Sequence, residues 1–195
     1  MWTGAILAGG QARRLGGIDK SALVVGSDSI LDRQLSLLRE LTPHILIVAG
    51  ANSKIAPKTV AADTMVVTDR MAGAGSLGGL YTALVEAPTE QVLVIACDMP
   101  FLTAPFLARL AERGEGVDAA VPRDERGRHP LCASYDRRIA GHLKARIDRG
   151  ELRVGDALTG LLVRELGPDE LGPFDPDGRL LLNVNTPADY ERART

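Results

Sequence analysis

Short apolar runs alternate along the chain with longer segments in which apolar residues recur at helical spacing. The runs consist mainly of Val, Ile and Leu, which is typical of strands covered on both faces. They predict strands at Gly4 to Ala8, Ile45 to Ala49, Met65 to Thr68, Val92 to Cys97, Asp118 to Val121, Leu131 to Tyr135 and Leu180 to Val184. Because strands that alternate with helices form a mostly parallel sheet, the pattern predicts an α/β fold.

Helix signals stand between these runs. Apolar residues share one helical face at Leu31, Leu35 and Leu38, at Phe106, Leu107 and Leu110, and at Ile139, Leu143 and Ile147. Ser29 and Thr103 are expected to cap the first two helices, and Gly150 to end the third. Thr186 is expected to cap a further helix that Pro187 opens.

Two loops interrupt the alternation. The stretch DRMAGAGSLGG, from Asp69 to Gly79, is too rich in glycine for regular structure, so a helix is expected to begin near Leu80. The stretch PRDERGRHP, from Pro122 to Pro130, is read first as a solvated turn between two strands, although His129 within it is a candidate substrate contact. No linker or repeat divides the sequence, so residues 1–195 are expected to form a single domain.

Composition and charge exclude several classes of protein. The 195 residues carry 23 Lys plus Arg against 25 Asp plus Glu, a net charge of −2 that offers no field for nucleic acid or anionic lipid. No apolar run approaches the roughly 18 residues of a membrane span, and the run from Trp2 to Ala8 is too short for a signal peptide. Cys97 and Cys132 lack the spacing of a zinc site or a disulfide framework. We therefore expect a cytoplasmic protein without nucleic acid or membrane partners.

A segment rich in glycine and basic residues follows the first predicted strand. It reads LAGGQARRLGGIDK, from Leu7 to Lys20. Open α/β sheets bind ligands at the carboxyl ends of their strands, glycines let backbone N–H groups approach phosphate oxygens, and basic side chains neutralise their charge. The spacing matches neither GxGxxG nor GxxxxGK[ST], which disfavours a nicotinamide or P-loop enzyme. The segment predicts a phosphorylated ligand, and the alternative is a turn with solvated cations.

Carboxylates and amides follow other predicted strands. Asp98 comes directly after the run Val92 to Cys97, where a carboxylate suits Mg²⁺, which completes its coordination with phosphate and water. The alternative for Asp98 is a turn or capping aspartate. Asp69 follows a strand in the same way and is expected on the same rim. Asn183 and Asn185 share one side of the last predicted strand, which indicates hydrogen bonds to a ligand or a metal-bound water.

The motifs LAGG, RRLGGIDK, CDMPFL, HPLCASY and LNVNTPADY, taken in order, resemble the molybdenum cofactor guanylyltransferases, the MobA-type family of nucleotidyltransferases. The resemblance covers nearly the whole chain. GGIDK and the asparagine motif narrow it from nucleotidyltransferases in general to this family. It implies a Rossmann-like three-layer sandwich of the nucleotide-diphospho-sugar transferase type. It also implies transfer of GMP from GTP to the terminal phosphate of molybdopterin, with Mg²⁺ present and pyrophosphate released.

The same resemblance implies roles for individual residues. The nucleotide-binding positions correspond to Leu7, Ala8, Gly9, Gly10, Lys20, Asp69 and Asp98. The catalytic positions correspond to Arg14, Lys20 and Asp98, and Asp98 would also hold Mg²⁺. The pterin-cofactor positions correspond to Gly17, Gly79, Asn183 and Asn185. Because a phosphate nucleophile is already ionised at neutral pH, these residues need only align the reactants and neutralise charge.

The chain departs from the family pattern in two places. Val48-Ala49-Gly50 stands where the family often has an asparagine, and Asn52 is displaced from that position. GSLGG, from Gly75 to Gly79, replaces GPLAG and predicts a looser loop, because a proline is lost and a glycine gained. The choice between GTP and CTP is therefore open. The alternatives are a related nucleotidyltransferase that uses CTP or a sugar phosphate, and a catalytically silent GTP-binding protein that delivers the cofactor. Further partners would be the proteins that supply molybdopterin or receive the product.

Overall fold

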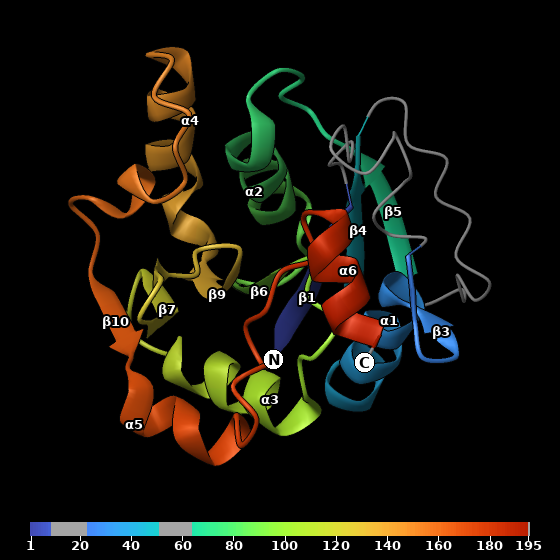
Figure 1. Cartoon of the computed structure of the whole chain (residues 1–195). Helices are drawn as coiled ribbons and strands as arrows, with labels where there is room; N and C mark the ends of the chain where they lie inside the picture. Colours follow the sequence, from blue (N-terminus) through green and yellow to red (C-terminus); the bar gives the residue numbers. More distant parts are fainter. Residues whose placement is uncertain (9–22, 51–63, 195) are drawn as a thin grey trace.

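A mixed sheet runs through the middle of the fold (Figure 1) in a computed structural model that describes residues 1–8, 23–50 and 64–194. Its strands are β1 (Trp2–Ala8), β4 (Ile45–Ala49), β5 (Thr64–Thr68), β6 (Gln91–Ala96), β7 (Ala119–Asp124), β8 (Gly127–Arg128), β9 (Cys132–Asp136) and β10 (Val163–Leu166). They stand in the order β10-β7-β9-β6-β1-β4-β5, with β8 paired to β7. Strand β1 is parallel to its neighbours β4 and β6, β4 is parallel to β5, and β7 is parallel to β10. Strand β9 is antiparallel to both β6 and β7.

Helices cover both faces of this sheet. They are α1 (Ile30–Leu41), α2 (Gly75–Glu86), α3 (Ala104–Arg113), α4 (Ala140–Asp148), α5 (Pro168–Leu171) and α6 (Pro187–Arg194). In Figure 1, α2 and α4 lie on one side of the sheet, and α1 and α3 on the other. Side chains of β1 alternate accordingly, since Ile6 packs with α1 and α3 while Ala5 packs with α2. The predicted three-layer α/β architecture with a mostly parallel sheet is confirmed.

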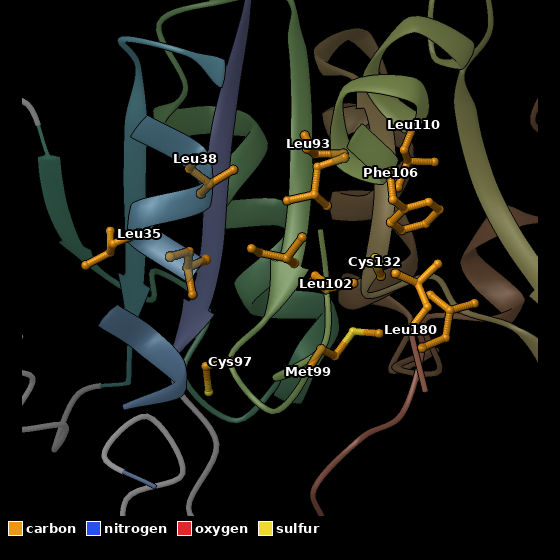
Figure 2. Close-up of a cluster of buried hydrophobic side chains, with 14 of the residues drawn as sticks. Leu35, Leu38, Leu93, Cys97, Met99, Leu102, Phe106, Leu110, Cys132 and Leu180 are labelled. Atoms are coloured by element: carbon orange, nitrogen blue, oxygen red, sulfur yellow. The ribbon is translucent and has the colours of Figure 1, made fainter. Parts of the chain in front are cut away.

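The apolar cluster between the sheet, α1 and α3 is drawn in Figure 2. Leu35 and Leu38 of α1 and Phe106 of α3 are fully buried in it. Each such side chain stabilises the fold by about 1.5–3 kcal/mol. A Cβ at Gly4 would lie only 2.7 Å from Leu38 Cδ2, so the glycine is what lets α1 approach β1 closely. Cys97 also belongs to this cluster, as expected for a small buried hydrophobic residue.

Local signals place several helix ends as predicted. Ser29 caps α1, where its Oγ accepts a hydrogen bond from the backbone N–H of Asp32 at 3.1 Å. Thr186 Oγ1 accepts from the backbone N–H of Asp189 at 3.2 Å, at the start of α6. Gly150 follows α4 with a φ of +75°, a conformation that glycine adopts without strain. None of the helices in the described ranges has the length and apolar character to cross a membrane.

The predicted strand from Leu180 to Val184 is wrong, because this segment is irregular. Leu180 is buried in the cluster of Figure 2, but its backbone N–H donates to Asp175 Oδ1 at 2.8 Å. The backbone N–H of Val184 donates to the Asp98 carbonyl at 2.8 Å. The apolar residues therefore mark a packed segment whose N–H groups have partners outside any sheet.

The two predicted loops also need correction. Helix α2 begins at Gly75 and not near Leu80, so the residues of GSLGG are helical and do not form the looser loop that was expected. The stretch from Pro122 to Pro130 is not a simple turn, because β7 extends to Asp124 and pairs with β8 as a short hairpin. A further hairpin, of β2 (Val24–Val25) and β3 (Asp28–Ser29), packs beside α6.

Candidate active site

A cleft of about 840 Å³ opens where β1, β4, β5 and β6 reach their carboxyl ends. Six of the residues to which the family resemblance assigns a role line it: Leu7, Asp69, Gly79, Asp98, Asn183 and Asn185. The side chain of Ala8 packs into the apolar cluster between the sheet, α1 and α3, and its contact with a nucleotide stays a prediction. The remaining site predictions, at Gly9, Gly10, Arg14, Gly17 and Lys20, lie outside the described residues, as does Asn52.

Asp98 sits in the turn that follows β6, where two neighbours from the C-terminal segment hold it. Asn183 Nδ2 donates to Asp98 Oδ1 at 2.9 Å, and the backbone N–H of Val184 donates to the Asp98 carbonyl at 2.8 Å. The expectation that Asn183 and Asn185 share a face of a strand fails, yet both reach the cleft. Asn183 reaches the cleft because the backbone N–H of the next residue, Val184, is hydrogen-bonded to the Asp98 carbonyl.

Asp69 directly follows β5 and is fixed from two sides. Its Oδ1 accepts hydrogen bonds from the backbone N–H of Met71 at 2.9 Å and from the hydroxyl of Thr82 at 3.0 Å. Thr82 is fully buried in α2, and its Oγ1 also accepts from the backbone N–H of Arg70 at 3.0 Å. Sequence reasoning missed Thr82, whose only signal was a hydroxyl among the apolar residues of a helix.

His129, which directly follows the hairpin of β7 and β8, also lines the cleft. Its Nε2 lies 2.9 Å from Asp124 Oδ1, and the side chain is 12% exposed. Partial burial raises the pKa of Asp124, but the contacts from His129 and Arg126 outweigh it and hold this pKa below its ordinary value. Arg128 also lines the cleft, and its Nε donates to Glu165 at 2.6 Å. His129 thus lines the cleft, and its contact with a substrate stays a prediction.

The donor atoms of the cleft fit a hard divalent cation. Within residues 1–8, 23–50 and 64–194, no group of three or more His, Cys, Asp or Glu side chains could hold a metal. A zinc site, which needs three or four protein ligands, therefore does not fit these residues. Mg²⁺ needs only one or two carboxylates, because phosphate and water supply its other ligands, and Asp98 offers such a carboxylate.

Comparison with known proteins gives one consistent result. Residues 4–161 match the family described as the MobA-like NTP transferase domain. The chain is 34% identical to a probable molybdenum cofactor guanylyltransferase of Pelotomaculum thermopropionicum, over 98% of this chain and 91% of that protein. It is 35% identical to a probable molybdenum cofactor guanylyltransferase of Chloroflexus aggregans, over 98% of this chain and 92% of the relative.

Solved structures show the same relationship. Molybdopterin-guanine dinucleotide biosynthesis protein A of Archaeoglobus fulgidus superposes with a TM-score of 0.83 at 27% identity, covering 100% of this chain and 97% of that one. A 2-C-methyl-D-erythritol 4-phosphate cytidylyltransferase of Thermus thermophilus shares the fold at a TM-score of 0.72 and 17% identity, covering 100% and 98% of the two chains. The predicted nucleotide-diphospho-sugar transferase fold is confirmed. The chain belongs to the MobA-like NTP transferase family.

Proposed function

We propose that this chain transfers the GMP moiety of GTP to the terminal phosphate of molybdopterin and releases pyrophosphate. The observation that carries the proposal is the placement of Asp98, at the carboxyl end of β6 in the cleft, with its carboxylate held by Asn183. The names of the relatives supply the nucleotide and the acceptor. A cytoplasmic location, and proteins that deliver molybdopterin or take up the product, belong to the same proposal.

The two substrates would occupy opposite sides of Asp98. GTP would lie over the ends of β1 and β5, where Leu7 and Asp69 line the cleft, and molybdopterin on the side of His129 and Asn185. An oxygen of the molybdopterin phosphate attacks the α-phosphorus of GTP. The bond from that phosphorus to the bridging oxygen breaks, and pyrophosphate leaves with the electron pair. The residues supply alignment, which converts an encounter of two anions into a reaction within one complex.

Charge is the main obstacle to this reaction, since both substrates are anionic and Asp69 and Asp98 add negative charge to the cleft. We assign neutralisation of the phosphates to Lys20 and Arg14, which lie outside the described residues, and to Mg²⁺ held by Asp98. When bound, Mg²⁺ supplies positive charge beside the phosphates. Asn183 keeps one carboxylate oxygen of Asp98 engaged and so orients the group toward its ligand.

Pyrophosphate release from the purified protein tests the proposal. The protein receives Mg²⁺ and molybdopterin, with GTP or CTP in separate reactions. Asp148→Ala is the matched control for Asp98→Ala, because Asp148 is an exposed carboxylate on α4 that pairs with Lys144. Release with GTP alone supports the proposal, and release with CTP alone assigns the chain to cytidylyl transfer. GTP binding without release would contradict catalysis and favour the cofactor-delivery role.

A further inference from the structure

Helix α1 buries a glutamine directly beneath the turn that carries Asp98. Gln34 is 1% exposed, although the other buried residues of this helix are an isoleucine and three leucines. Its Nε2 donates to the carbonyl of Ala96 at 2.8 Å and to the carbonyl of Met99 at 3.1 Å. These two carbonyls flank Asp98 in the chain, so one amide nitrogen connects both ends of the turn.

The turn is thereby held on several sides. Gln34 holds the backbone before and after Asp98, Val184 holds the Asp98 carbonyl, and Asn183 holds its carboxylate. Figure 2 shows Cys97 and Met99, the chain neighbours of Asp98, within the apolar cluster. Such restraints leave the Asp98 carboxylate little freedom to move relative to the sheet.

Gln34 carries a cost that packing alone does not explain. Its Oε1 is buried and has no hydrogen-bond partner among the described residues. A buried acceptor without a partner destabilises the folded state. An apolar side chain of the same length would avoid that cost, but it would leave the carbonyls of Ala96 and Met99 without this donor. Gln34 therefore leaves its own Oε1 without a partner in the described part of the chain, while its Nε2 fixes the turn that carries Asp98.

We propose that Gln34 is a positioning residue for the metal–nucleotide complex, acting through the Asp98 turn without touching either ligand. The inference rests on the proposed function only in that Asp98 meets a divalent cation and a nucleotide. Partners beyond the direct ligands of a metal typically change its affinity by about 10- to 100-fold when they are removed. Gln34 is expected to act at the lower end of that range, since it holds the backbone and not the carboxylate.

Gln91, at the start of the strand that leads to the Asp98 turn, provides a matched control for Gln34. Its Nε2 donates to the carbonyl of Ala111 and to Ser134 Oγ, the latter at 2.9 Å, and so also joins buried groups across the fold. Gln91 begins β6, whereas the Asp98 turn follows its end, a separation of about 20 Å along an extended strand. Gln34→Met and Gln91→Met each remove an amide donor of this kind and keep the side-chain length.

The experiment measures Mn²⁺ binding by electron paramagnetic resonance, in the presence of a GTP analogue with a non-hydrolysable α–β bridge. GTP binding without metal and the melting temperature are measured in parallel. Both variants are expected to lower Tm, by about 2–8 °C. Gln34→Met is expected to weaken Mn²⁺ binding about tenfold with metal-free GTP binding unchanged, and Gln91→Met less than about twofold.

Equal Mn²⁺ affinities of the two folded variants would overturn the inference, as would a wild-type protein that binds no Mn²⁺ with the analogue. If Gln34→Met does not fold, Gln34→Asn answers the same question, because it keeps the amide but shortens its reach by one methylene. Unchanged Mn²⁺ affinity in Gln34→Asn would likewise overturn it. No molybdopterin is present in these measurements, so their outcome is independent of whether the chain transfers GMP.

Discussion

Two adjacent glycines of α2 are expected to respond to alanine in opposite directions. A Cβ at Gly78 would lie 2.8 Å from the carbonyl oxygen of Met71 and 3.0 Å from its Cβ. A Cβ at Gly79 would meet the methyl groups of Leu7 at 3.7 Å, which is ordinary contact. The first position therefore lacks room beside rigid backbone, and the second has room for a methyl group.

The magnitudes follow from two competing effects. Alanine is favoured over glycine in a helix interior by up to about 1 kcal/mol, because it restricts the unfolded chain. Gly79→Ala should retain most of this gain and stabilise the protein by about 0.5 kcal/mol. At Gly78 the contact is with backbone, so the overpacking cost lies in the upper part of its usual range, at about 2–3 kcal/mol. After the helix gain of up to about 1 kcal/mol is subtracted, Gly78→Ala should lower the free energy of unfolding by about 1–2 kcal/mol.

Urea denaturation of both variants measures this difference, with GTP binding as the second readout. Gly78→Ala displaces Met71, whose backbone N–H holds Asp69, so GTP binding should weaken together with stability. Gly79→Ala should be more stable than the wild type, while its effect on turnover tests the pterin-binding role that the family resemblance implies. A Gly78→Ala protein as stable as the wild type would show that the Met71 backbone moves away from position 78 at no cost, which contradicts the prediction.

Asp98→Ala is expected to reduce pyrophosphate release by about 100-fold or more while the thermal melt stays near that of the wild type, and retained turnover would exclude its catalytic role. Thr82→Val keeps the shape of a buried side chain but removes the hydroxyl that holds Asp69, so GTP binding measured by calorimetry should weaken about fivefold; an unchanged affinity would mean that Met71 alone suffices. A further prediction is that the carboxylate of Asp189 stabilises the fold in a pH-dependent way. Desolvation raises its pKa, but hydrogen bonds to the carboxylate outweigh this and lower the pKa from 3.8 to about 2. Its contribution is therefore complete above about pH 5 and is lost progressively as the pH falls through 2, so Asp189→Asn should cost about 1 kcal/mol at pH 7 and clearly less near pH 2 in urea titrations. A cost at pH 2 as large as that at pH 7 would contradict the assignment.

The sheet was largely predictable because its central strands are apolar runs buried on both faces. Strand β10 was missed because Arg164 and Glu165 give it a polar appearance, which an edge strand tolerates. The segment from Leu180 to Val184 misled in the opposite direction. Its leucines match the apolar pattern of a strand, but the segment pairs with neither edge strand of the described sheet, β10 or β5. A run of apolar residues indicates that a segment is buried. Whether the buried segment becomes a strand is decided by the hydrogen-bond partners available to its backbone.

The candidate site was also predictable only in part. Asp69 and Asp98 were found from the rule that ligands bind at the carboxyl ends of parallel strands, and both line the cleft. The start of α2 at Gly75 could not be predicted, because glycine disfavours helix and the reason for Gly78 is a close contact with Met71 that no local pattern records. Gln34 was likewise invisible, since its partners are backbone carbonyls more than sixty positions away.

The hydrogen bond from Asn183 to Asp98 joins residues that lie 85 positions apart in the chain. During synthesis every described strand of the sheet, up to Leu166 at the end of β10, leaves the ribosome before Asn183 does. A nascent chain that folds from its N-terminal part can thus form the cleft while the Asp98 carboxylate still lacks this partner. A chain that ends after β10 would lack both this hydrogen bond and the buried side chains of Leu180 and Leu181, so the C-terminal segment completes the core and the Asp98 turn in the same late step of synthesis.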